Sequence, residues 1–141
     1  MKISVFGLGY VGCITAACLA DEGHQVIGVD VNTAKIQSIQ AGHSPIAEPG
    51  LAQMIGENVV ANRLSATTNA AEAVLATDIS LICVGTPSQP NGNLDTEFVL
   101  RVCSQIGQAL TQKNTYHLVA MRSTILPDAL AQCTAVLQQN S

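Results

Sequence analysis

The chain has 141 residues, of which 48% are hydrophobic and only 11% charged, and its formal net charge is -4. The six basic residues are scattered singly along the chain, so we expect no nucleic-acid partner, because no basic patch could neutralise a phosphate backbone. No apolar run approaches the roughly 18 residues that a membrane span needs, and early glycines interrupt the apolar stretch that a secretory signal requires. The composition therefore favours one cytoplasmic domain that is not bound to a membrane.

Short β-forming segments alternate with helical segments along the chain. We expect five strands, at residues 3–6, 25–30, 64–68, 79–84 and 117–121. Helices are expected at residues 11–20, 33–40, 49–61, 70–76, 95–112 and 127–137. Strands that alternate with helices pair in parallel through right-handed crossovers. The pattern predicts an α/β fold, a Rossmann-type doubly wound parallel sheet between two helical layers, truncated before or at a sixth strand.

A glycine-rich turn joins the first strand to the first helix. Gly7, Gly9 and Gly12 form the pattern G-x-G-x-x-G, and Asp30 ends the second strand 21 residues after Gly9. Dinucleotide-binding domains place an acid at a spacing of about 20 residues. In them the first glycine permits the tight turn, the second lets a pyrophosphate approach the backbone, and the third lets the helix pack closely. These residues predict a dinucleotide site at the start of the first helix, where backbone N–H groups attract phosphate.

Asp30 also indicates which dinucleotide is bound. Its carboxylate can accept hydrogen bonds from ribose hydroxyls, whereas a 2′-phosphate about 4 Å away would be repelled by on the order of 4 kcal/mol at an effective dielectric constant of about 20. No arginine follows Asp30, although Lys35 is near it in sequence. The sequence therefore predicts NAD rather than NADP.

Hydroxyl and charged side chains follow other strands or turns. Thr86, Arg122 and Thr124 come after the fourth and fifth expected strands, where open α/β sheets bind ligands. The residues alone leave two alternatives for the threonines, a cofactor contact or a cap of a helix or turn. For Arg122 a phosphate or a partner domain is the alternative to a structural role. We interpret Glu48, in an E-P-G turn, as a turn carboxylate rather than an acid–base group.

Cysteine and histidine residues give no metal-binding pattern. The five cysteines lack a C-x-x-C spacing and sit in apolar sequence contexts, so we expect them to be reduced and packed as small hydrophobic residues. The three histidines are isolated from one another, and no metal site is expected. The residues are Cys13, Cys18, Cys83, Cys103 and Cys133, and His24, His43 and His117.

Six segments in order resemble the NAD-binding half of the UDP-glucose/GDP-mannose dehydrogenases. They are GLGYVG at 7–12, GVDV at 28–31, SPIAEPGL at 44–51, VGTPS at 84–88, NGNLD at 91–95 and RSTILP at 122–127. The resemblance runs from residue 1 to about residue 130, and one departure is Asp128 where the family usually has glycine. It implies that the backbone of Tyr10 and Val11 contacts the pyrophosphate, that Asp30 and Lys35 lie at the ribose, and that Thr86 and Thr124 line the nicotinamide side.

The resemblance also implies a reaction. The family oxidises the C6 hydroxyl of a nucleotide sugar to a carboxylate with two NAD, through a thiohemiacetal on a cysteine. The VGTPS and NG-x-LD segments favour oxidation of GDP-mannose to GDP-mannuronate over the UDP-glucose 6-dehydrogenase alternative. None of the five cysteines has the family's C-x-P-K-D context, so we expect no catalytic residue here. The chain is then an N-terminal domain that is inactive alone, and the sugar-binding domain and the central helix of a homodimer or larger oligomer lie beyond it.

Two further alternatives stay open at this point. A dinucleotide-binding module of this kind could act as a non-catalytic sensor that regulates a partner. It could also serve a different β-hydroxyacid-type dehydrogenase with the same cofactor fold, which only the resemblance of the SPIAEPGL and VGTPS segments disfavours.

Overall fold

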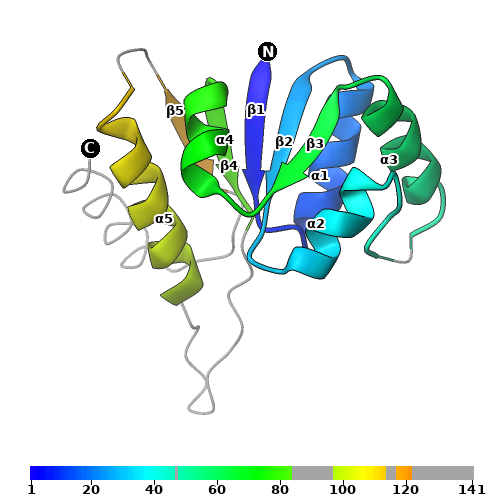
Figure 1. The fold of residues 1–141 in the computed structure, drawn as a ribbon, viewed down its shortest axis with the longest axis horizontal. Helices are drawn as coiled ribbons and strands as arrows, with labels where there is room; N and C mark the ends of the chain where they lie inside the picture. The colour runs from blue at the N-terminus through cyan, green and yellow to red at the C-terminus, as the bar shows by residue number, and fades with distance from the viewer. Residues whose placement is uncertain (47, 84–96, 114–116, 122–141) are drawn as a thin grey trace.

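The structure is a computed structural model that describes residues 1–46, 48–83, 97–113 and 117–121 (Figure 1). The strands in this part of the chain are β1 (Lys2–Phe6), β2 (Gln25–Val29), β3 (Leu64–Thr67), β4 (Ile79–Ile82) and β5 (Leu118–Met121). The helices are α1 (Tyr10–Asp21), α2 (Thr33–Gln40), α3 (Leu51–Val60), α4 (Ala70–Ala76) and α5 (Glu97–Leu110).

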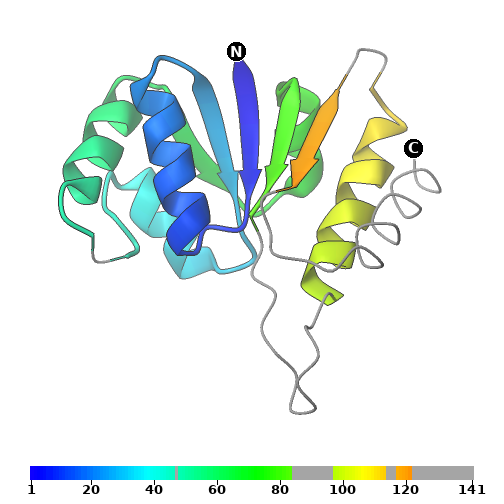
Figure 2. The same ribbon diagram turned by 180° about the vertical axis from the view of Figure 1, so that it is seen from behind.

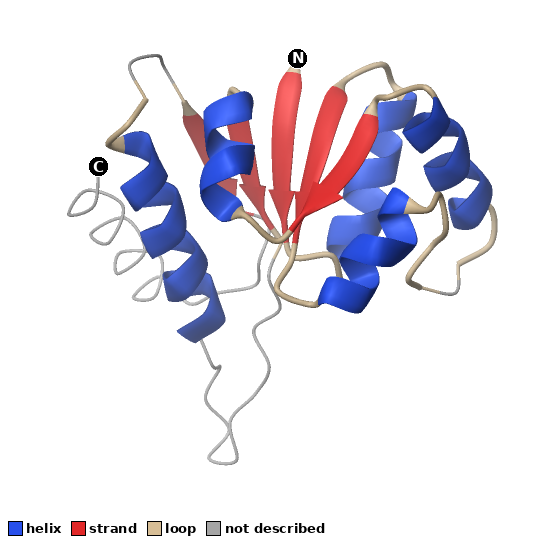
Figure 3. Ribbon diagram, in the orientation of Figure 1, coloured by secondary structure: helices blue, strands red, loops and turns tan. Residues whose placement is uncertain are grey.

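The five strands form one sheet in the order β3-β2-β1-β4-β5. Every neighbouring pair is parallel, and the central strand β1 pairs on one side with β2 and on the other with β4. The strand order reverses beside β1: β2 and β3 follow one another on one side of β1, and β4 and β5 follow on its other side. This confirms the predicted α/β fold with a doubly wound parallel sheet (Figure 3).

Helices cover both faces of the sheet. Figures 1 and 2 show α1 and α3 on one face and α4 and α5 on the other. Successive side chains of β1 point to opposite faces, so Ile3 and Val5 pack in the core under α1 while Phe6 packs in the core under α5. A strand buried on both faces needs apolar residues at nearly every position, which is why this segment was recognisable in the sequence.

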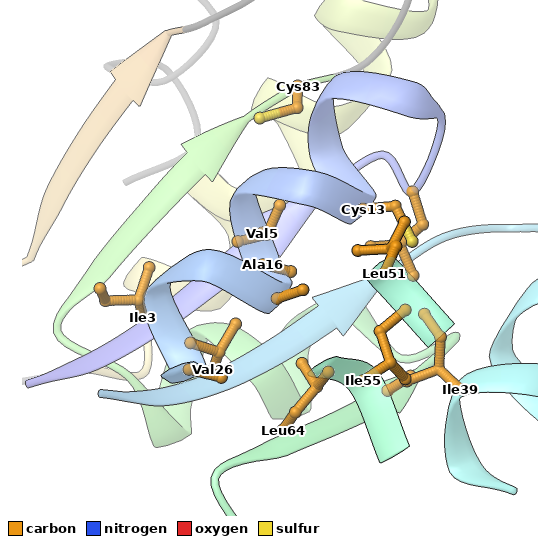
Figure 4. Packing of buried hydrophobic residues seen from close by; sticks show 14 of the residues in the cluster. Ile3, Val5, Cys13, Ala16, Val26, Ile39, Leu51, Ile55, Leu64 and Cys83 are labelled. Atoms are coloured by element: carbon orange, nitrogen blue, oxygen red, sulfur yellow. The ribbon is translucent and has the colours of Figure 1, made fainter. Parts of the chain in front are cut away.

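Small residues let α1 lie close to the sheet. Cys13, Ala16, Ala17 and Ala20 recur at helical spacing and are all buried, and Figure 4 shows Cys13 and Ala16 among the branched side chains of that core. The expectation that cysteines pack as small hydrophobic residues is confirmed for Cys13, Cys83 and Cys103. It is wrong for Cys18, which is exposed because it lies off the buried stripe of α1.

Several element boundaries differ from the expected ones by one or two residues, and the start of α3 and the end of β4 show why. We expected a helix to begin at Pro49, but α3 begins at Leu51, after an N-cap Gly50 with a φ of 80°. The left-handed conformation of Gly50 turns the chain into the helix, and Leu51 N–H donates to the Glu48 carbonyl at 3.1 Å across that turn. The fourth strand ends at Ile82, although the Cys83 N–H still donates to the Phe6 carbonyl at 2.7 Å.

Several expectations fall outside the described residues. They are the loop at 85–93, the helix at 127–137, and the side chains of Thr86, Arg122, Thr124 and Cys133. Within the residues that are described, no helix is long and apolar enough to cross a membrane.

Candidate dinucleotide-binding site

The first and third glycines of the G-x-G-x-x-G segment bring α1 against β1. Gly7 has a φ of 95°, a left-handed conformation that side chains rarely adopt, and its N–H donates to the Val29 carbonyl of β2 at 2.8 Å. A Cβ atom added at Gly12 would lie 1.6 Å from the Gly7 carbonyl oxygen. The turn role of Gly7 and the packing role of Gly12 are therefore both visible in the fold.

The N-terminus of α1 presents unused backbone donors. Its N-cap is Gly9, which has no side chain to cap the helix, and the first turn holds no acidic residue. By contrast, the Asn32 side chain caps α2 and the Asn69 side chain caps α4. The first N–H groups of a helix have no partner within the helix, and together with the helix dipole they attract an anion. A Cβ atom added at Gly9 would meet no atom within 4 Å, so space is open beside these donors.

Asp30 lies directly beside the glycine turn and helps to build it. Its Oδ2 accepts a hydrogen bond from the Leu8 N–H at 2.7 Å, and its Oδ1 accepts one from the Asn32 N–H at 2.9 Å. A carboxylate has about four acceptor positions, so each oxygen keeps one for a ligand. The prediction placed Asp30 at this sheet edge but missed that it fixes the conformation of the turn.

A pocket extends from Asp30 across the carboxyl edge of the sheet to α5. Apolar side chains from three elements line it, namely Phe6, Val29 and Val102, and Gly7 and Val31 border it near Asp30. Thr68 and two polar side chains of α5, Arg101 and Gln105, complete its wall. The combination of an apolar floor and a few polar groups suits a flat heteroaromatic ring joined to a polar sugar.

The α5 wall of this pocket could not be recognised in the sequence. Arg101 and Gln105 are one helical turn apart and are both exposed, which in the sequence resembles the solvent face of an amphipathic helix. Packing of α5 across the sheet, through the buried Cys103 and Ile106, brings them to a residue that is about seventy positions earlier.

Tyr10 and Glu48 connect the glycine turn with the segment before α3. The Tyr10 hydroxyl donates to Glu48 Oε2 at 3.1 Å, and the residue Tyr10 is 59% exposed. This hydrogen bond and the carboxylate charge raise the pKa of Tyr10 above its ordinary value. Glu48 thus lies in the turn before α3, and it has a specific partner on α1.

The structure joins the remaining predicted site residues to Asp30 by no hydrogen bond among the residues that it describes. Val11 is exposed in the first turn of α1. Lys35 lies in the first turn of α2, and its charge acts on the buried Cys13 thiol of α1, whose pKa is raised by burial and lowered in part by Lys35. Thr86 and Thr124 lie outside the described residues. Among the residues that are described, no three His, Cys, Asp or Glu side chains cluster as a metal site would require.

The chain as a whole is similar to a known family. The family model described as "UDP-glucose/GDP-mannose dehydrogenase family, NAD binding domain" matches residues 1–141. GDP-mannose 6-dehydrogenase of Azotobacter vinelandii is 54% identical over 127 residues, which are 90% of this chain and 29% of that protein. A UDP-glucose 6-dehydrogenase of Haloferax volcanii is 39% identical over 127 residues, again 90% of this chain and 29% of that protein. The chain therefore spans about three-tenths of the length of these relatives.

A solved structure agrees over the whole fold. The ternary complex of GDP-mannose dehydrogenase from Pseudomonas aeruginosa superposes with a TM-score of 0.98 at 47% identity, covering 100% of this chain and 33% of that one. The glycine turn, the bare helix N-terminus and the acid at the end of β2 thus occur in a chain whose sequence and fold both match one family. The chain belongs to the UDP-glucose/GDP-mannose dehydrogenase family, and it is the NAD-binding domain of that family.

Proposed function

We propose that this chain holds NAD for the oxidation of a nucleotide sugar, with the pyrophosphate at the N-terminus of α1 and the adenosine ribose at Asp30. One observation carries the proposal. The uncapped start of α1 and the Asp30 carboxylate lie at the same edge of the sheet, and the Leu8 N–H joins them at 2.7 Å from Asp30 Oδ2. A helix N-terminus attracts the diphosphate, and the acid beside it has acceptor positions left for the ribose hydroxyls.

The described residues around this edge support the proposed places of the diphosphate and of the adenine ring. The open space beside Gly9 admits the diphosphate to the backbone N–H groups of Tyr10 and Val11. The pocket between Asp30 and α5 has the apolar floor that an adenine ring needs. Lys35 is assigned to the ribose, and Thr86 and Thr124 to the nicotinamide side, on the resemblance of their sequence segments to the family.

The reaction follows from the relatives rather than from a catalytic group on this chain. When bound, NAD supplies the hydride acceptor for oxidation at C6 of the sugar. The residues described above bind and orient the cofactor, which contributes by fixing the reacting atoms in position. The relatives of about 50% identity are named GDP-mannose 6-dehydrogenase, so GDP-mannose, oxidised to GDP-mannuronate with two NAD, is the proposed substrate, and UDP-glucose is the alternative.

The proposal also covers the whole protein. We assign residues 1–141 to the cofactor domain. We assign the thiol chemistry, the sugar site and the dimerising central helix to the regions of the relatives that this chain does not match. The proposed working state is a cytoplasmic homodimer or larger oligomer. By itself the chain is expected to bind NAD but to produce no NADH with GDP-mannose or UDP-glucose.

The test is a calorimetric titration of the chain with NAD and with NADP. Because Asp30 also fixes the glycine turn, Asp30→Asn should disturb the turn and weaken the binding of both cofactors. Only the ratio of the NAD and NADP affinities therefore reports on the ribose contact. The wild-type chain should bind NAD at least tenfold more tightly than NADP. A tenfold preference needs about 1.4 kcal/mol, which is less than the repulsion expected between a 2′-phosphate and a carboxylate. Asp30→Asn should bring the ratio close to one.

Glu22→Gln is the matched control. Glu22 is an exposed acid at the opposite end of α1, so its loss changes the net charge equally but should leave the ratio as in the wild type. Equal affinity of the wild-type chain for NAD and NADP would refute the role of Asp30, and absence of NAD binding would refute the proposed site as a whole.

A further inference from the structure

Five polar side chains converge beneath α4 and α5, away from the dinucleotide site. Two of them lie on β1 and β4, and the other three lie just after α4, after α5 and before β5. They are Ser4, Ser80, Thr77, Lys113 and His117. Ser4 and Ser80 are fully buried and Thr77 is 2% exposed. Buried polar groups are costly unless their hydrogen bonds are complete. The hydrogen bonds of this cluster therefore determine which protonation state of each group is stable in it.

The Lys113 ammonium group uses all of its donors. Its Nζ contacts the Val74 carbonyl at 3.0 Å, the Thr77 carbonyl, and His117 Nδ1 at 2.9 Å. An ammonium has three N–H donors and no acceptor. His117 Nδ1 must therefore be the acceptor in this contact, and the ring must be neutral.

The other ring nitrogen continues the network in one direction. With Nδ1 unprotonated, Nε2 carries the hydrogen and donates to Ser80 Oγ at 2.8 Å. Ser80 Oγ lies 2.7 Å from Ser4 Oγ, which in turn donates to the Ile79 carbonyl at 3.3 Å. Among the described residues no buried side-chain nitrogen or oxygen lacks a hydrogen-bond partner. The network is complete with a neutral His117, and a second proton on the ring, at Nδ1, would remove the acceptor that Lys113 uses.

A proton added at His117 Nδ1 would face the ammonium group. Two donors and two positive charges would then replace one hydrogen bond across 2.9 Å. Burial and the neighbouring Lys113 charge lower the pKa of His117, while a hydrogen bond with the Thr77 carbonyl and the charge of Asp78 partly oppose this. Acidification therefore breaks the contact between Lys113 and His117.

This contact fixes the end of α5. Lys113 follows α5 by three residues, and its ammonium ties that end to the last turn of α4 and to the residue before β5. The other part of α5 carries Arg101 and Gln105 into the wall of the pocket beside Asp30. A shift of α5 away from α4 would therefore alter the pocket.

We propose that Lys113 and His117 form a proton-sensitive clasp that keeps α5 in place as a wall of the dinucleotide pocket, so that protonation of His117 lowers dinucleotide affinity. The link to affinity rests on the function proposed above, whereas the clasp itself does not. A ligand responds to such a change only if it binds the clasped form better than the released form. Reciprocally, bound NAD should make His117 harder to protonate.

The test compares the wild-type chain with His117→Gln at pH 7.5 and pH 5.5. A glutamine can accept from Lys113 and donate to Ser80 without titrating. In the unfolded wild-type chain a histidine of pKa about 6.5 is about ten parts protonated to one at pH 5.5. While the folded ring stays neutral, the unfolding equilibrium constant therefore rises by up to about 10-fold between pH 7.5 and pH 5.5 on this account. Stability is thus present above pH 6.5 and is lost as the pH falls below it, and His117→Gln should lack this loss in urea unfolding.

Two further arms make the result decisive. His43→Gln, at an exposed histidine, should behave like the wild type at both pH values. Lys113→Met should weaken NAD binding at pH 7.5. At a pH low enough for NMR to show a protonated His117 ring in the folded wild-type chain, the wild type should lose NAD affinity and His117→Gln should keep it. The clasp is refuted if His117→Gln and the wild type show the same pH dependence of unfolding. Its link to the pocket is refuted if the two proteins bind NAD equally at a pH where the folded wild-type ring is protonated. A wild-type chain that fails to bind NAD at pH 7.5 refutes the proposed function instead.

Discussion

Replacing Gly12 by alanine should destabilise the fold even when no ligand is present. The added Cβ atom would lie 1.6 Å from the Gly7 carbonyl oxygen and 2.8 Å from the Gly7 carbonyl carbon. Real Cβ atoms essentially never approach another atom within 3.0 Å, so the two backbones must separate by more than 1 Å. Neither contact is with a side chain that could rotate away, and therefore α1 itself has to move off the sheet.

The size of the effect can be bounded. Overpacking a well-packed core typically costs 1–3 kcal/mol, and a clash between two backbones belongs at or above the upper end, about 3 kcal/mol. Domains of this kind have a total stability of about 5–15 kcal/mol. With a urea dependence of about 2 kcal/mol per molar, the unfolding midpoint should fall by roughly 1.5 M.

Gly9→Ala is the matched control in the same loop. Gly9 has an extended conformation, with a φ of -76°, and a Cβ atom there would meet nothing within 4 Å. Alanine is a poorer N-cap than glycine, so a cost within about 1 kcal/mol is expected, while NAD binding should weaken because the new methyl group occupies the space proposed for the diphosphate. Urea unfolding of Gly12→Ala that matches the wild type would refute the packing argument.

Two further outcomes are expected. Arg101→Ala or Gln105→Ala should weaken the binding of ADP-ribose, measured by calorimetry, whereas Gln108→Ala on the same helix should not. For Arg101 the loss should be about 5- to 30-fold, because a guanidinium over the adenine ring contributes about 1–2 kcal/mol. Unchanged affinity in both wall variants would place the adenine elsewhere. Glu48→Gln should lower the pKa of Tyr10 toward its ordinary value, because the carboxylate that raises it is gone, and an ultraviolet titration of tyrosine absorbance that shows no such decrease would contradict the Tyr10–Glu48 contact.

The parts of the fold that the sequence predicted well are those in which local pattern and tertiary environment agree. β1 is buried on both faces, and β4 is buried on one face and partly buried on the other, so their apolar composition alone distinguished them. The helix expected at residues 70–76 from its composition matches α4, and in the structure Asn69 caps it, since Asn69 Oδ1 accepts from the Glu72 N–H at 3.1 Å. The glycine turn and Asp30 were found together because their spacing reflects one βαβ unit.

The errors occur where two local rules compete or where composition is uniform. Proline favours the first helical position, yet a left-handed Gly50 starts α3 two residues later than Pro49. Alanine-rich α1 has almost no contrast between its faces, so the sequence could not show that Cys13 is buried and Cys18 exposed. The pocket wall on α5 was missed for a different reason, because its distance along the chain from Asp30 leaves no local pattern to recognise.

The same carboxylate that is proposed to recognise the ribose also holds the turn that receives the diphosphate, and this has a consequence for affinity. Because Asp30 fixes the Leu8 and Asn32 amides without a ligand, the turn is ordered during folding, and NAD binding does not have to order it again. Pre-organisation of this kind raises affinity by removing an entropic cost from the binding step. It also means that an acid at this position is selected by two requirements at once. A glutamate, one methylene longer, could still reach a ribose hydroxyl but would have to displace one of the two amides to do so, and the close fit of the turn therefore favours aspartate here.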